Sequence, residues 1–108
     1  MVNEIQHDIS LRRYNTFAVE ASCHQFIDIT EESQLAGLHE EGYFQRAFLV
    51  LGAGSNVLFT KNYEGLIIHM ASKGIQHFIE GNYIFVTAKA GEVWNDFVWY
   101  CINHGFAG

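Results

Sequence analysis

The chain contains 108 residues, of which 49% are hydrophobic and 17% are charged, with ten glycines and no proline. This length corresponds to one domain, and the hydrophobic fraction excludes an intrinsically disordered segment. Twelve acidic residues against six basic ones give a formal net charge of −6, which argues against a nucleic-acid-binding protein.

The chain carries no sign of export or membrane insertion. No apolar stretch approaches the roughly 20 residues of a membrane-spanning helix, and the first residues lack the apolar core of a secretory signal. Cys23 and Cys101 belong to no CxxC pair, so neither a zinc site nor a disulfide scaffold is indicated. We therefore expect a cytoplasmic protein without membrane contact, in which both thiols are free and buried.

The first half of the chain predicts a strand, a helix and a second strand. Residues 1–19 show no sustained period and are expected to be a loop, whereas residues 23–29 alternate as in a strand. The Thr30 hydroxyl is expected to cap a helix over residues 31–41, which Gly42 ends in a left-handed conformation. The continuous apolar run 47–51 predicts a parallel strand covered on both faces.

The second half predicts a strand, a hairpin and a helix. Residues 66–70 are apolar and are expected to form a buried strand, and residues 74–80 and 83–90 form a hairpin around Gly81-Asn82. The fold class that follows is α+β, with a mixed sheet and a βαββ start.

The last predicted element is an amphipathic helix over residues 92–104, with Gly105 just after its end. Trp99 falls on its polar face, so it is either exposed or covered by protein outside this chain. The broad apolar face contains Val93, Trp94, Phe97, Val98 and Cys101.

The segment with the clearest chemical signal follows the apolar run 47–51 directly. Two glycines around one small residue allow a sharp turn whose backbone N–H groups can converge on an anion. The side chains of Ser55 and Asn56 add hydrogen-bonding groups. The candidate phosphate- or diphosphate-binding residues are Gly52, Ala53, Gly54, Ser55, Asn56, Val57 and Leu58.

This segment matches no common nucleotide-binding motif. Val57 stands where the dinucleotide-binding pattern has its third glycine, and no Gly-Lys-Ser/Thr of a P-loop follows. The segment can equally be a simple tight turn, and this alternative stays open. The six histidines are scattered without metal-ligand spacing, so no metal site is predicted.

Four segments occur in an order that resembles a known family of flavoenzymes. On these residues the chain resembles the amino-terminal part of the UDP-N-acetylenolpyruvoylglucosamine reductase family, also called the UDP-N-acetylmuramate dehydrogenases, over nearly all of its length. The combination of segments is fairly specific to that family, whereas each alone would be weak. The segments are Asn15-Thr16-Phe17, residues 51–58, Lys73-Gly74-Ile75, and Ala90-Gly91-Glu92 with Trp94 two residues later.

The resemblance implies an FAD-binding fold of the vanillyl-alcohol-oxidase type, incomplete in this chain. It implies cytoplasmic bacterial enzymes of peptidoglycan precursor synthesis, which pass a hydride from NADPH to FAD and then to an enolpyruvyl UDP-sugar. Residues 52–58 would hold the FAD diphosphate. Residues 1–71 would form the first FAD-binding subdomain, and residues 72–108 the truncated beginning of the second.

Parts of the family's pattern have no counterpart here, namely its second flavin-contacting segment, its proton-donating serine, its carboxylate near the carboxyl terminus and its substrate domain. We therefore expect no catalytic residue in this chain and no turnover by it alone. An uncovered helix face and sheet edge also predict self-association. Two alternatives remain: an FAD-linked oxidase of the same superfamily, and a non-enzymatic interaction module that binds a partner through Trp99.

Overall fold

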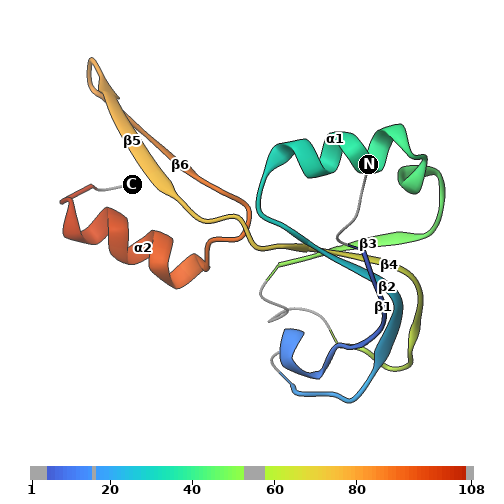
Figure 1. Cartoon of the computed structure of the whole chain (residues 1–108). Coiled ribbons are helices and arrows are strands. Elements are labelled where there is room, and N and C mark those ends of the chain that lie inside the picture. Colours follow the sequence, from blue (N-terminus) through green and yellow to red (C-terminus); the bar gives the residue numbers. More distant parts are fainter. Residues whose placement is uncertain (1–4, 16, 53–57, 107–108) are drawn as a thin grey trace.

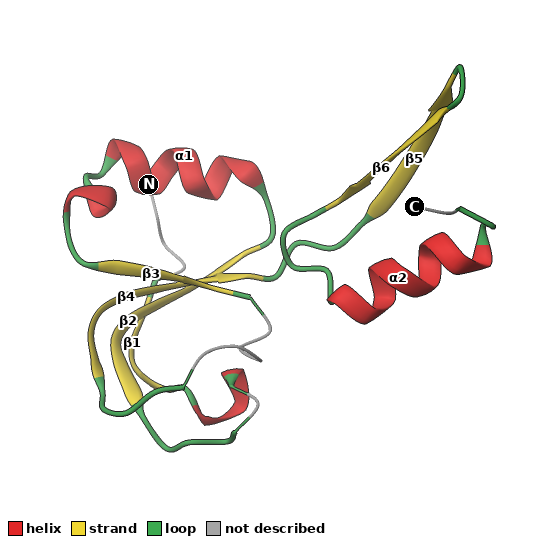
Figure 2. Cartoon of the chain, turned by 180° about the vertical axis from the view of Figure 1, so that it is seen from behind, coloured by secondary structure: helices red, strands yellow, loops and turns green. Residues whose placement is uncertain are grey.

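The structure is a computed structural model that describes residues 5–15, 17–52 and 58–106. Figure 1 shows two parts that stand apart: a four-stranded sheet with helix α1, and a hairpin with helix α2. The short segment after β4 links them, and the reverse view in Figure 2 shows the same separation. We call them the sheet region and the hairpin region.

The sheet region contains a mixed sheet in the order β1-β2-β4-β3. The parallel strands are β2 (Ser22–Ile29), β4 (Tyr63–Met70) and β3 (Phe48–Leu51). Their carboxyl ends therefore lie at one edge of the sheet, which we call the carboxyl edge. Strand β1 (Gln6–Ser10) pairs with β2 in the antiparallel direction. It precedes the expected βαββ unit, in a segment where we expected only a loop.

The two faces of this sheet bury separate clusters. On one face, α1 (Glu32–Glu40) packs with Leu38 fully buried against Ile27, Ile29, Leu66 and Ile68. The other face is covered by the segment after β1, which includes the short 3-10 helix η1 (Arg12–Tyr14). Buried residues of this second cluster include Leu11, Phe26, Leu51, Phe59 and Ile67.

The start of α1 differs in one detail from the expectation. Glu31 is the N-cap, and it forms a capping box in which the Gln34 side-chain oxygen accepts the Glu31 backbone N–H at 3.0 Å. Thr30, the expected cap, instead contributes its own backbone N–H to the same Gln34 oxygen at 2.8 Å. Gly42 has a φ of 78° at the N-cap of the 3-10 helix η2 (Tyr43–Gln45), which confirms the left-handed stop.

Strand β3 is parallel, as expected, but it is not covered on both faces. It is one of the two edge strands of the sheet formed by the described residues. Phe48 and Val50 are 39% and 54% exposed, whereas Leu51 is buried. The continuous apolar run of residues 47–51 therefore belongs to a partly exposed edge strand, not to a central strand that is covered on both faces.

The hairpin region forms a sheet of its own. Strands β5 (Ile75–Glu80) and β6 (Tyr83–Ala88) pair around Gly81, whose φ of 61° fits the expected turn. Helix α2 (Trp94–Asn103) follows, and Gly105 with a φ of 73° lies just after its C-cap. A hydrogen bond of 2.6 Å joins His77 Nδ1 on β5 to Tyr100 Oη on α2.

The apolar face of α2 is only half-buried. Phe97, Val98 and Cys101 are partly covered, but Trp94 is 72% exposed although it was expected on the covered face. Trp99 is 60% exposed, in agreement with its place on the polar face. Among the described residues, neither helix has the length and apolar character needed to cross a bilayer.

Candidate functional site

The candidate loop begins at the carboxyl edge of the sheet. Gly52 follows β3 directly, and β2 and β4 end at the same edge. In open sheets with parallel strands, ligands bind beyond the carboxyl ends of the strands. The predicted loop is therefore located where this architecture places binding sites.

Of the seven candidate residues, the structure describes Gly52 and Leu58; Ala53, Gly54, Ser55, Asn56 and Val57 lie outside the described residues. A Cβ added at Gly52 would meet no atom within 4 Å, so this residue faces open space. Leu58 is 61% exposed. The residues just outside, Leu51 and Phe59, are buried in one cluster and anchor both ends of the segment.

A cleft of about 410 Å³ lies at the same edge, between the start of α1 and the base of the hairpin. Ile29, Leu35 and Met70 provide apolar walls, while Thr30 and Lys89 provide a hydroxyl and an ammonium group. Apolar walls suit an aromatic ring system, and cations and hydroxyls suit phosphate oxygens. Glu31 and Glu32 also line the cleft, and their carboxylates do not suit phosphate oxygens. The lining therefore fits the ring system of the flavin dinucleotide that the resemblance implies, but not its diphosphate.

A histidine–aspartate pair at the carboxyl edge was not singled out by the sequence analysis. Asp28 and His69 are cross-strand neighbours on β2 and β4, and Asp28 Oδ1 lies 2.7 Å from His69 Nδ1. His69 is also the register partner of Leu51, the residue before Gly52. The one available signal was a histidine inside the otherwise apolar run of residues 66–70.

The segments around Gly74 and Gly91 form a joint between the two regions rather than a ligand site. A Cβ at Gly91 would lie 2.5 Å from the Ser72 carbonyl oxygen and 2.7 Å from that of Met70, so no side chain fits. The Gly91 N–H donates to Ser72, and Glu92 accepts the Gly74 N–H. The backbone N–H groups of Gly91 and Glu92 are both bonded within the chain, so neither is free to bind a ligand.

Asn15, which belongs to one of the resembling segments, has a structural role. It is 6% exposed, and its amide nitrogen donates to the Leu11 carbonyl at 2.7 Å. Its amide oxygen accepts the Val19 N–H at 2.9 Å. The Asn15 side chain thus holds together the loop that covers Phe26. In the described structure, this residue of the sequence pattern stabilises the fold.

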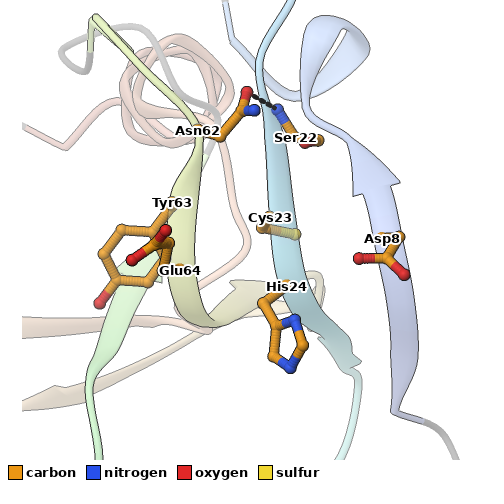
Figure 3. A pocket seen from close by; sticks show the side chains of 7 residues that line it. All are labelled: Asp8, Ser22, Cys23, His24, Asn62, Tyr63 and Glu64. Carbon is orange, nitrogen blue, oxygen red and sulfur yellow. Dashed lines mark hydrogen bonds between the residues drawn. The ribbon is translucent and has the colours of Figure 1, made fainter.

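A second cavity, of about 390 Å³, lies at the opposite end of β2 (Figure 3). Asn62 accepts the Ser22 N–H at 2.9 Å on its wall, and Cys23 lies between the flanking strands. Burial raises the pKa of the Cys23 thiol, which keeps it protonated and unreactive. Across the described residues, no three of His, Cys, Asp and Glu come together in a way that could hold a metal ion.

Comparison with known proteins gives a consistent result. Residues 28–108 match a protein family described as FAD binding domain. UDP-N-acetylenolpyruvoylglucosamine reductase of Flavobacterium johnsoniae is 40% identical over 106 residues, which are 97% of this chain and 31% of that protein. The enzyme of the same name from Bacteroides fragilis strain YCH46 is 37% identical over 96% of this chain and 32% of its own length.

A third relative with this name, from Shewanella sediminis, is 33% identical over 96% of this chain and 30% of its own length. The chain therefore spans about three tenths of the length of the curated relatives it matches.

Proposed function

Because the chain belongs to the FAD binding domain family, we propose that it is the amino-terminal FAD-binding part of a UDP-N-acetylenolpyruvoylglucosamine reductase. The longer protein would reduce the enolpyruvyl UDP-sugar with NADPH in the cytoplasm, as a step of peptidoglycan precursor synthesis. The relatives that carry this enzyme name match 96–97% of the chain, which supports this assignment over a general FAD-linked oxidase.

The observation that carries the proposal is the position of Gly52. It opens a glycine-containing segment at the carboxyl edge, faces open space, and is held by the buried Leu51. We propose that residues 52–58 hold the FAD diphosphate, with backbone N–H groups and the side chains of Ser55 and Asn56 as donors. When bound, FAD supplies the hydride chemistry.

The division of the chain into two FAD-binding subdomains is also part of the proposal. Residues 1–71 would form the first FAD-binding subdomain, and residues 72–108 the beginning of the second. The two separate sheets and the glycine joint between Ser72 and Gly91 support a boundary close to residue 71. The exposed apolar side chains of β5, β6 and α2 support a tendency of this chain to self-associate.

FAD binding by the purified chain tests the proposal. Titration of FAD with the chain should quench flavin fluorescence in a saturable way. Replacement of both Ser55 and Asn56 by Ala should weaken binding roughly a hundredfold or more, since each of the two hydrogen bonds to a charged group contributes about 1.5–3 kcal/mol. Asn82→Ala, at the exposed hairpin turn, is the matched control and should leave the affinity unchanged.

Absence of saturable FAD binding by the unaltered chain would contradict the proposal. If FAD binds, NADPH oxidation by the longer protein distinguishes the proposed reductase from an FAD-linked oxidase. The proposed reductase oxidises NADPH only when the enolpyruvyl UDP-sugar is present.

A further inference from the structure

The sheet region and the hairpin region are connected through two short segments that lie side by side. Residues 71–74 lead from β4 to β5, and we call them the crossing segment. Residues 89–92 lead from β6 towards α2, and we call them the return segment. Both lie at the narrow place between the regions (Figures 1 and 2). Among the described elements, no helix or strand of one region packs extensively against the other region. The relative orientation of the two regions therefore depends on these segments.

Backbone hydrogen bonds fix the crossing segment on both sides. The Ala71 N–H donates to the last carbonyl of β2 at 2.8 Å. The Ser72 carbonyl accepts the Gly91 N–H at 3.0 Å, and the Gly74 carbonyl accepts the Lys89 N–H at 2.9 Å. The crossing segment is thus attached to the sheet at its start and to the return segment along its length.

Two charged side chains connect the segments in opposite directions. Lys73 Nζ on the crossing segment donates to the Gly91 carbonyl at 2.5 Å. Glu92 Oε2 on the return segment accepts the Gly74 N–H at 2.5 Å. Hydrogen bonds with one ionised partner are about twice as strong as those between neutral groups. The charged residue of each segment therefore binds the glycine of the other, and we call these two hydrogen bonds the crossed bonds.

Both glycines are needed for this arrangement. Gly74 has a φ of 144°, a conformation that residues with a side chain rarely adopt. At Gly91 the neighbouring backbone leaves no room for a Cβ. Lys73-Gly74 and Gly91-Glu92 belong to two separate segments of the sequence pattern, and in the structure they form one joint.

The joint lies beside the cleft of about 410 Å³. Ile29 and Met70 line this cleft from the sheet region, and Thr87 lines it from the hairpin region. Ser72 and Ala90 also line it, and each comes directly before a residue of the crossed bonds. Because the two walls belong to different regions, the width of the cleft depends on how firmly the joint is held.

We propose that Lys73 and Glu92 are positioning residues, whose crossed bonds hold the two regions in one relative orientation and keep the cleft formed for the ring system of a ligand. The inference rests on the proposed function, because it takes this ring system to be the flavin of FAD. Without either bond, the two regions adopt a wider range of orientations. The affinity of a ligand that needs the formed cleft then falls with the fraction of molecules in which the cleft is formed.

The distance between the two regions tests the effect of the crossed bonds without a ligand. Spin labels at Ala36→Cys on α1 and Asn82→Cys at the hairpin turn report this distance by double electron–electron resonance. Cys101→Ser removes the partly exposed thiol, and Cys23 is buried. We expect a narrow distance distribution in this labelled chain, and one roughly twice as broad after Lys73→Met or Glu92→Ala. Dilution with unlabelled chain excludes distances between copies.

FAD binding tests the positioning role. Lys73→Met and Glu92→Ala should each lower the affinity for FAD roughly threefold to tenfold, because the cleft is formed in fewer molecules. Added FAD should narrow their broad distance distributions, since the ligand selects the orientation with a formed cleft. The urea midpoint of unfolding should stay close to that of the unaltered chain, because the buried core lies in the sheet region.

Conservative and matched variants separate the crossed bonds from a general effect of charge. Lys73→Arg still has a charged donor, and Glu92→Gln keeps an oxygen that can accept an N–H. Both variants should keep a narrow distribution and most of the affinity for FAD. Lys61→Met and Glu80→Ala remove the same charged groups at exposed positions away from the joint, and they should change neither measurement.

The outcomes distinguish this inference from the proposed function. If folded Lys73→Met and Glu92→Ala keep the narrow distribution, or if Lys61→Met and Glu80→Ala broaden it equally, the inference is wrong. If only Lys73→Met and Glu92→Ala broaden it but bind FAD as tightly as the unaltered chain, the positioning role is wrong and the proposed function stands. If the unaltered chain shows no saturable FAD binding, the proposed function and the positioning role both fail.

Discussion

The sheet region and the hairpin region have similar hydrophobic side chains but bury them very differently. All buried hydrophobic residues of the described part of the chain lie between Leu11 and Ile68, in the sheet region. In the hairpin region Phe78, Phe85 and Trp99 are 54%, 46% and 60% exposed. Burial of apolar surface is the main favourable contribution to folding, so the stability of this chain is concentrated in the sheet region.

The difference is explained by how many layers each region has. The four-stranded sheet has α1 on one face and the segment after β1 on the other, so central strands are covered twice. Of the elements that the structure describes, α2 alone lies beside the β5–β6 hairpin, and it covers the hairpin in part (Figure 1). A two-stranded hairpin with one incomplete cover is marginal on its own, so the hairpin region needs further protein surface to bury its aromatic side chains.

The largest expected effect is in the centre of the sheet region. Phe26 is fully buried and contacts the Tyr14 ring, with centroids 4.6 Å apart. Phe26→Ala should lower the free energy of unfolding by about 3–5 kcal/mol, through lost burial and a cavity. Urea denaturation followed by circular dichroism measures this loss. A decrease below about 1 kcal/mol would contradict the view that this region holds the core.

An intermediate effect is expected at the joint between the regions. Gly91→Ala places a Cβ against the backbone of Ser72 and Met70, and the resulting overpacking should cost about 1–3 kcal/mol. Hydrogen exchange should show faster exchange at the Gly91 amide, while the amides of β2 and β4 stay protected. Gly52→Ala is the matched control, because its Cβ meets nothing and unfolding should stay unchanged. Similar losses in both variants would refute this account.

The smallest effect on unfolding is expected in the hairpin. Phe85 stacks on Phe78 across the two strands, with ring centroids 4.9 Å apart, but both rings remain exposed. Phe85→Ala makes the same truncation as Phe26→Ala, yet it should change the free energy of unfolding by no more than about 0.5 kcal/mol. Sedimentation velocity should show weaker self-association of this variant. A destabilisation as large as that of Phe26→Ala would remove the contrast between the regions.

Much of the fold was predictable from local patterns in the sequence. The alternation of residues 23–29, the glycine stops at Gly42 and Gly105, and the turn at Gly81 all correspond to observed features. These signals act over a few residues, through side-chain period or the freedom of glycine at positive φ. The glycine-containing segment after residue 51 also follows from sequence, because it needs only a buried strand and small residues.

Other features depended on contacts between distant residues. Strand β1 has no clear period, and its hydrogen bonds exist only because β2 lies beside it. Val50 and Trp94 are apolar in the sequence, but their exposure depends on which layers cover them. Likewise, Gly91 gives no local sign that the backbone of Met70 and Ser72 leaves no room for a side chain.

The Asp28–His69 pair shows most clearly which features cannot be predicted from the sequence. The amino-acid sequence by itself determined the strands that carry the two residues and the glycine segment that follows β3. Only the tertiary structure decided that residues 41 positions apart would lie 2.7 Å from each other at the start of that segment. The physical reason is that secondary-structure signals are local, whereas strand order and register are decided by the packing of the whole sheet.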